Sequence, residues 1–208
     1  VKLMRLHNDL GPEDNFHWFS TTGWIMWNCQ IGGLLVGATA CVYDGNPAWP
    51  DYGTLWRFAG DVGLHFLGAS AAFFAACQKH GIEPREIADL RSLRGVGSTG
   101  SPLAPESYHW FAEKLGRDVW IDPISGGTDF AGAFVGGVPT LPVYLGEMQG
   151  RCLGARVEAF NEQGQPVIDE VGELVCTAPM PSMPLYFWND PGNKRYLESY
   201  FDMFPGVW

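Results

Sequence analysis

The sequence predicts an α/β fold: a mostly parallel sheet with helices on both faces, followed by a smaller β-rich portion. Short apolar runs alternate with helix-like segments over residues 1–145, which is the pattern of βαβ units. Nearly half of the 208 residues are hydrophobic, so the chain can bury a sizeable core. From about residue 146 the pattern changes to short strands around a turn, which is typical of antiparallel pairing. We therefore expect an α/β portion over residues 1–145 and a β-rich continuation of the same domain over residues 146–208.

Apolar periodicity, capping residues and turn residues predict the elements of the first part of the chain. Residues 20–22 (Ser-Thr-Thr) offer oxygens that can cap a helix, and residues 44–47 (Asp-Gly-Asn-Pro) have turn chemistry. In residues 54–62, Leu55, Phe58 and Val62 share one helical face. The expected elements are a helix over residues 1–6, an extended aromatic segment over 16–19, a buried helix over 24–35, a buried strand over 38–43, a helix over 54–62 and a short strand over 65–67.

Capping and turn residues also mark the ends of the elements predicted for the second part of the chain. Ser70 is placed to cap an apolar helix that Gly81 closes. Residues 161–164 (Asn-Glu-Gln-Gly) form a turn between two strand-like runs, and the prolines of 179–184 break regular structure. The expected elements are a helix over residues 71–80, a strand over 93–96, a helix over 105–115, a strand over 119–121, antiparallel strands over 156–160 and 173–177, and a final helix over 193–200.

The charge balance argues against two classes of partner. The chain has 23 acidic and 13 basic residues, a formal net charge of −10, and such a surface repels nucleic acid and anionic lipid. The longest apolar stretch, residues 31–43, contains three glycines and is shorter than the roughly 20 residues of a membrane span. We therefore expect a soluble protein with neither a nucleic-acid nor a membrane partner.

The cysteines and histidines form no recognisable metal or disulfide pattern. The five cysteines are odd in number, dispersed and never in a CxxC pair, which favours buried side chains in a reducing compartment. The five histidines show no metal-binding spacing. We therefore expect a cytoplasmic protein without a zinc site.

Two loops that follow predicted strands are candidates for ligand binding, because ligands bind at the carboxyl ends of parallel strands. In residues 97–103 (Gly-Ser-Thr-Gly-Ser-Pro-Leu) the glycines allow a ligand to approach the backbone, and the next helix N-terminus favours phosphate. Taken alone, this loop is explained more readily as an ordinary strand-to-helix turn capped by Ser or Thr. Residues 122–129 place the hydroxyl of Thr128 beside the carboxylate of Asp129, which could hold Mg²⁺. The alternative there is an Asx-type turn.

Taken together and in this order, the two loops resemble the adenylate-forming superfamily of acyl-CoA synthetases, luciferases and peptide-synthetase adenylation domains. Residues 100–102 (Gly-Ser-Pro) look like its Gly-Glu-Pro adenine-site loop. Residues 127–129 (Gly-Thr-Asp) look like its Thr-Glu signature, although aspartate stands here in place of glutamate. The resemblance implies that Thr128 and Asp129 are catalytic and that Asp129 helps to hold Mg²⁺. It implies a nucleotide site made of Gly100, Ser101, Pro102, Asp122, Gly127 and Thr128.

Further matches follow the order of the superfamily. Residues 22–27 resemble the start of its acyl-pocket helix, residues 45–50 the Gly-x-Pro-x-Trp-Pro run of the acetyl-CoA synthetase branch, and residues 172–175 its Gly-Glu-Leu strand. The resemblance spans essentially the whole chain, and within the superfamily the sequence looks most like the branch that activates acetoacetate. The phosphate loop, the ribose-binding aspartate and the C-terminal lysine of the superfamily would lie outside residues 1–208. We therefore expect a truncated large domain that is inactive alone.

The resemblance also implies the substrate and the reaction. Where acetate-activating relatives carry bulky tryptophans, this chain has Ser125 and Gly126, which leaves room for a longer acid such as acetoacetate. The expected reaction uses ATP, Mg²⁺ and CoA: the acid attacks the α-phosphate to give acyl-AMP and pyrophosphate, and CoA then displaces AMP. The expected acyl pocket consists of Trp24, Ile25, Asn28, Ser125 and Gly126.

Two alternatives remain open on the residues. One is another short- or medium-chain acyl-CoA synthetase. The other is a non-catalytic nucleotide-binding module of α/β type, which the composition alone permits. An amino-acid adenylation domain is disfavoured, because the acyl-helix segment has no acidic residue to pair with an ammonium group.

Overall fold

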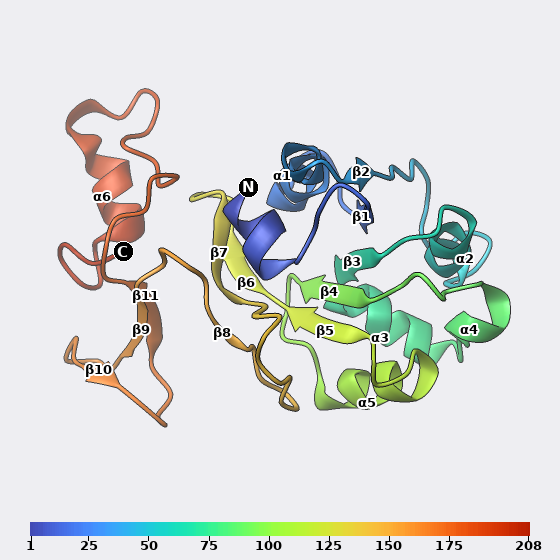
Figure 1. Ribbon diagram of the computed structural model, residues 1–208. Coiled ribbons are helices and arrows are strands. Elements are labelled where there is room, and N and C mark those ends of the chain that lie inside the picture. Colours follow the sequence, from blue (N-terminus) through green and yellow to red (C-terminus); the bar gives the residue numbers. More distant parts are fainter.

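A five-stranded parallel sheet forms the centre of the computed structural model, which describes all 208 residues. Its strand order is β2-β1-β3-β4-β5, and every neighbouring pair is parallel (Figure 1). The strands are β1 (Asn15–Trp18), β2 (Thr39–Ala40), β3 (Phe66–Ser70), β4 (Gly95–Thr99) and β5 (Trp120–Pro123).

Helices cover both faces of this sheet, as the sequence predicted. On one face, Leu67, Val96 and Ile121 pack into the largest core cluster with side chains of the helices below the sheet in Figure 1. On the other face, Phe16 and Phe66 pack beneath the N-terminal segment and the helix that follows β1. The helices are η1 (Leu3–His7, a π-helical turn), α1 (Ile25–Gly32), η2 (Gly33–Val36, 3₁₀), α2 (Thr54–Asp61), α3 (Ala71–Lys79), α4 (Pro84–Ile87) and α5 (Pro105–Lys114).

Helix α3 begins and ends where its capping residues predicted. The Ser70 hydroxyl accepts a hydrogen bond from the Phe73 N–H at 3.2 Å, which satisfies one donor of the first turn. Gly81 has φ +63°, and the Ile82 N–H donates to the Cys77 carbonyl at 3.0 Å. This is the Schellman arrangement that a left-handed glycine allows.

One row of residues crosses the sheet on the face beneath η1 and α1. Trp18 of β1 pairs with Gly68 of β3, Gly68 with Gly97 of β4, and Gly97 with Asp122 of β5. The Trp18 indole lies over both glycines, because a Cβ on either one would overlap the ring. The absence of two side chains therefore makes room for one large aromatic ring, and Asp122 lies at the end of the same row.

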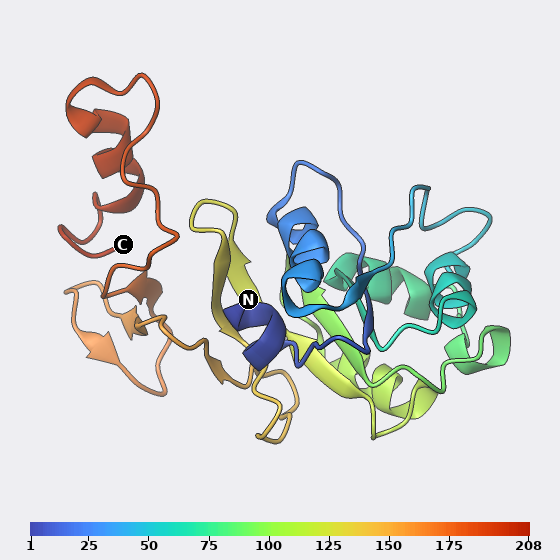
Figure 2. The same cartoon turned by 45° about the horizontal axis from the view of Figure 1, so that its top comes forward.

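Two small antiparallel sheets extend from the edge of the parallel one (Figure 2). A hairpin starts directly after β5, and a second sheet follows it in the chain. The first sheet contains β6 (Ser125–Gly127), β7 (Gly132–Gly136) and β8 (Gly150–Arg151); the second contains β9 (Val157–Phe160), β10 (Pro166–Val167) and β11 (Glu173–Cys176). The chain ends with η3 (Pro191–Asn193) and α6 (Lys194–Tyr200), in the orange-red region at the left of Figures 1 and 2.

Several expected elements differ from those observed. The strand expected over 38–43 is reduced to β2 at the sheet edge, and Val42 is 56% exposed. The helix expected over 24–35 forms as α1 and η2, but Leu34 and Leu35 are exposed, so it is not a buried helix. The strand expected over 93–96 begins and ends later, at β4. The turn at 161–164 leads into β10, whereas β11 pairs with the other edge of β9. No helix is long and apolar enough to cross a membrane.

Candidate functional site

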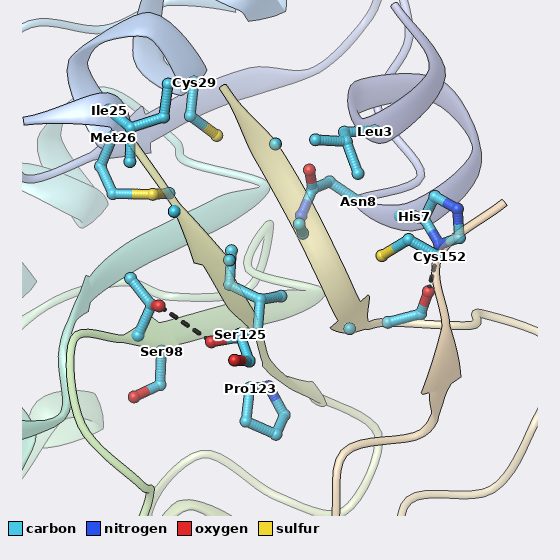
Figure 3. A pocket seen from close by; sticks show the side chains of 18 of the residues that line it. Leu3, His7, Asn8, Ile25, Met26, Cys29, Ser98, Pro123, Ser125 and Cys152 are labelled. Atoms are coloured by element: carbon cyan, nitrogen blue, oxygen red, sulfur yellow. Dashed lines mark hydrogen bonds between the residues drawn. The ribbon is translucent and has the colours of Figure 1, made fainter. Parts of the chain in front are cut away.

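A cavity of about 720 Å³ lies at the carboxyl ends of β4 and β5, where ligands bind in parallel sheets. Its walls come from η1, α1, the loop after β4 and the β6–β7 hairpin, and Figure 3 shows the side chains that line it. Nine of the residues expected to bind ligand line this one cavity, although they come from three separate segments of the chain: Trp24, Ile25, Asn28, Gly100, Ser101, Pro102, Ser125, Gly126 and Gly127.

The loop after β4 forms the first wall. Gly100 has φ +91°, a left-handed conformation that glycine adopts without strain. A Cβ at this position would lie 3.7 Å from the Trp24 indole, so this ring borders the loop. The Thr99 hydroxyl donates to the Ile124 carbonyl at 2.8 Å and joins the end of β4 to the chain that follows β5. Gly100, Ser101 and Pro102 are exposed in this loop.

The start of α1 forms the second wall. Trp24, Ile25 and Asn28 line the cavity, whereas Trp27 does not. Asn28 is exposed, and Trp24 and Ile25 are half-buried against the core cluster around Phe16. Successive turns of one short helix thus present an indole, an aliphatic chain and an amide to the same space.

Strand β6 forms the third wall. The Ser125 side chain lines the cavity, whereas a side chain at position 126 would clash with the neighbouring strand. Ser125 is half-buried and lines the cavity (Figure 3). Gly126 also lines it, but a Cβ on Gly126 would overlap the Gly132 carbonyl oxygen and lie 2.8 Å from the Ala133 Cα. A side chain at 126 would therefore point into the backbone of β7. Gly126 permits close pairing in the hairpin, and a tryptophan there would break this pairing.

The residues of the expected catalytic signature lie outside the cavity. Thr128 and Asp129 are exposed in the turn that joins β6 to β7, where the Ala131 N–H donates to the Thr128 carbonyl at 3.1 Å. Asp129 lies against Tyr200 of α6, and burial together with this carboxylate raises the pKa of Tyr200 to about 12. The turn therefore meets the C-terminal segment.

The candidate ligands for Mg²⁺ include a single carboxylate, that of Asp129. No group of three or more histidine, cysteine or acidic side chains converges anywhere in the chain. Mg²⁺ keeps several waters and is commonly held by one or two carboxylates together with substrate phosphates. Asp129, exposed beside Thr128, fits the role of such a single carboxylate.

Asp122 lies behind the cavity wall and does not line the cavity. It is completely buried, and Asn8 donates to its Oδ2 from Nδ2 at 2.9 Å. Its Oδ1 makes no hydrogen bond within the protein. Burial raises the pKa of Asp122 to about 7, while the Asn8 amide opposes the shift. With no exposed surface, Asp122 cannot contact a nucleotide in the way the sequence led us to expect.

Sequence reasoning missed the part of the cavity formed by η1. His7 and Asn8 line the cavity and are each only 4% exposed. His7 spans two distant segments, with Nδ1 2.7 Å from the Gly137 carbonyl and Nε2 accepting from the Leu153 N–H at 3.0 Å. A single histidine near the start of a sequence carries no signal for such long-range contacts.

The chemistry available in the cavity is binding and positioning. Cys29 lines the wall, but its burial, together with the charge of Asp122, raises its thiol pKa, so the thiol stays protonated. His7 uses both ring nitrogens in backbone contacts, so it cannot act as a base for a nucleophile. The site therefore offers glycine-rich backbone, hydroxyls, amides and apolar walls.

Comparisons with known proteins point in one direction. Residues 1–187 match the family model of the AMP-binding enzymes. The chain is 46% identical over its whole length to an acetoacetyl-coenzyme A synthetase of Rhizobium meliloti and 42% identical over 98% of its length to an acetoacetyl-CoA synthetase of Gallus gallus. It also superposes over its whole length on an acetoacetyl-CoA synthetase from Streptomyces lividans, with a TM-score of 0.94 and 48% identity.

These matches cover only part of the relatives. The chain spans 32% of the Rhizobium protein, 30% of the Gallus protein and 32% of the Streptomyces structure. It therefore corresponds to about a third of each of them.

Proposed function

This chain belongs to the AMP-binding enzyme family, and we propose that the complete gene product activates acetoacetate with ATP and transfers it to CoA. The observation that carries this proposal is the cavity at the ends of β4 and β5, which brings together three segments that resemble motifs of the adenylate-forming enzymes. The similarity to relatives named acetoacetyl-CoA synthetase supports the choice of acid.

In the proposed reaction, a carboxylate oxygen of the acid attacks the α-phosphorus of ATP, and pyrophosphate leaves. The CoA sulfur then attacks the acyl carbon, and AMP leaves while the thiol proton passes to solvent. Neither step needs a nucleophile from the protein, which agrees with a protonated Cys29 thiol and a His7 ring whose two nitrogens are both engaged. The protein has to hold two anions together, which depends on positioning and on preorganised donors.

We assign the nucleotide to the wall made by Gly100, Ser101 and Pro102, which are exposed and line the cavity. We assign the phosphates to Gly127, which lines the cavity at the end of β6, and to Thr128, which follows it in the turn. Asp129 would hold Mg²⁺, which would supply positive charge to the phosphates.

The acid is assigned to the space among Trp24, Ile25, Asn28 and Ser125, all of which line the cavity. Gly126 contributes by letting β6 and β7 pair closely rather than by leaving a side-chain-sized gap. The five cysteines are all free, which fits our proposal that the protein is cytoplasmic.

A panel of acids tests this function with the complete gene product. ATP- and Mg²⁺-dependent acyl-CoA formation is measured with acetate, propionate, butyrate, acetoacetate and octanoate. We expect the highest kcat/KM for acetoacetate. A maximum at another short- or medium-chain acid would make that acid the substrate in place of acetoacetate. Failure to form acyl-CoA with any acid would contradict the ligase function and favour a nucleotide-binding module.

A further inference from the structure

Four polar side chains that line the cavity are at least nine-tenths buried: His7, Asn8, Ser98 and Thr99. His7 uses both ring nitrogens, and the Thr99 hydroxyl donates to a carbonyl. Only Asn8 and Ser98 have hydrogen-bonding capacity left over. Buried polar groups are normally satisfied, so the unused capacity of these two points to a ligand.

The two residues lie on different sides of the cavity. Figure 3 shows Ser98 on the side of Pro123, whereas Asn8 lies on the opposite side with Leu3 and His7. Asn8 also lies near α1, because it directly follows η1, in which the Met4 sulfur lies 4.0 Å from the Cys29 sulfur of α1. Asn8 therefore belongs to the part of the cavity that we assign to the acid.

The orientation of the Asn8 amide is fixed from behind. One N–H donates to Asp122 Oδ2 at 2.9 Å, and this carboxylate is completely buried at the end of a strand. Gly137 packs against the other oxygen of this carboxylate, because a Cβ on Gly137 would lie only 2.6 Å from Asp122 Oδ1. The second N–H and the carbonyl oxygen of Asn8 make no hydrogen bond within the protein.

Apart from Asn28 and Ser125, which are less buried than Asn8, the side chains around this part of the cavity are mostly apolar or carry sulfur. Its walls include Met4, Ile25, Met26, Cys29, Ala133 and Cys152. A polar atom is costly in such surroundings unless it finds a partner. An acid with an oxygen on its third carbon would supply that partner, whereas a simple fatty acid would not.

We propose that Asn8 recognises the keto oxygen of a short 3-oxo acid through its free N–H, and that Asp122 is the positioning residue that orients the amide. The inference rests on the proposed function and deepens it, because it names the residue that distinguishes a 3-oxo acid from its saturated analogue. A site built to bond a substrate oxygen discriminates strongly against an analogue that lacks it.

The test compares acetoacetate with butyrate, which has the same number of carbons but no keto oxygen. In the complete gene product, Asn8→Leu should lower the acetoacetate/butyrate ratio of kcat/KM by about tenfold or more. Because Asn8→Leu leaves Asp122 without its donor, the double variant Asn8→Leu/Asp122→Leu, which replaces both partners by apolar groups, is measured too.

Ser107→Ala is the matched control. It removes the acceptor of a part-buried side-chain hydrogen bond, from Gln78 Nε2 at 2.7 Å, and Ser107 itself does not line the cavity. Its acid ratio should equal that of the wild type. A ratio within about twofold of the wild type in a folded Asn8 variant would overturn the inference while leaving the ligase function in place. A wild type that forms no acyl-CoA with any acid would overturn both.

Discussion

At the scale of single residues, Asp122 shows how its place in a sheet determines what a carboxylate can do. Asp122 pairs with Gly97 in the row that begins at Trp18, and so it faces the side of the sheet covered by η1. Residues on a strand alternate between the two faces, and the Asp122 side chain lies on the face that η1 buries. The carboxylate therefore fixes Asn8 instead of binding ligand directly.

Asp122 should make stability depend on pH. Its pKa is raised from 3.8 to about 7 by burial, so between these values the folded state binds a proton that the unfolded state lacks. This contribution is fully present at low pH and is lost as the pH rises through about 7. Relative to Asp122→Asn, the wild type should lose on the order of 2–4 kcal/mol of unfolding free energy between about pH 5 and about pH 7.5.

Urea unfolding of both proteins at the two pH values measures this difference, since groups other than Asp122 cancel between them. Asp202→Asn, at an exposed carboxylate near the C-terminus, is the surface control. A difference that does not change with pH would mean that the carboxylate is ionised in the folded protein throughout this range.

Ser125 and Gly126 are neighbours with opposite expected responses to tryptophan. Ser125→Trp should place an indole in the cavity and raise the acetate/acetoacetate ratio of kcat/KM by about tenfold or more, because acetate needs less space. Gly126→Trp should instead disrupt the β6–β7 pairing, since its Cβ would overlap the Gly132 carbonyl, and lower activity with both acids. Kinetics with both acids and a thermal melt distinguish these effects; an unchanged ratio in folded Ser125→Trp would place the acid elsewhere.

At the scale of elements, β3 and β4 depend on their glycines to accommodate an aromatic ring. A Cβ on Gly97 would lie 2.5 Å from the Trp18 ring, and the interior offers little room to relax. Gly97→Ala should therefore cost about 1–3 kcal/mol of unfolding free energy. Pairing it with Trp18→Leu should recover part of that cost, because the smaller side chain vacates the space.

Chemical denaturation of the two single variants and the double variant gives the coupling energy. Gly23→Ala is the control, because a Cβ there meets nothing within 4 Å. Strictly additive effects would mean that the strands shift apart instead of pressing on the ring.

Other elements show which parts of the fold could be predicted from the sequence. The capping of α3 depends on local residues, and Ser70 and Gly81 behave as their chemistry indicates. The reduced strand β2 and the exposed Leu34 and Leu35 were not predictable, because apolar composition indicates burial but does not reveal which partner is present. Short apolar segments are ambiguous for this reason.

At the scale of the whole molecule, the site combines segments that are far apart in the chain. The loops after β4 and β5 were recognisable as ligand-binding loops, since parallel strands bring their carboxyl ends together. The contribution of Asn8 was not, because its bond to Asp122 spans 114 residues and has no local signature. The β6–β7 hairpin was also missed, since its glycine-rich strand has little of the composition typical of strands.

The turn of this hairpin carries the last prediction, because it links the cavity wall to the C-terminal segment through Asp129 and Tyr200. If Asp129 holds Mg²⁺ beside the nucleotide phosphates, Asp129→Ala should lower ATP–pyrophosphate exchange on the order of 100-fold or more and raise the Mg²⁺ concentration needed. Since Asp129 is exposed, the unfolding free energy should change by less than about 0.5 kcal/mol.

Asp129→Glu should retain most of the exchange, because it keeps the carboxylate, and Tyr200→Phe tests whether the contact with α6 contributes instead. If the phenol oxygen matters more than the carboxylate, Tyr200→Phe will lower exchange as much as Asp129→Ala does. Exchange that is unchanged in Asp129→Ala at saturating Mg²⁺ would remove Asp129 from the metal site and leave it as a contact between the hairpin and the C-terminal segment.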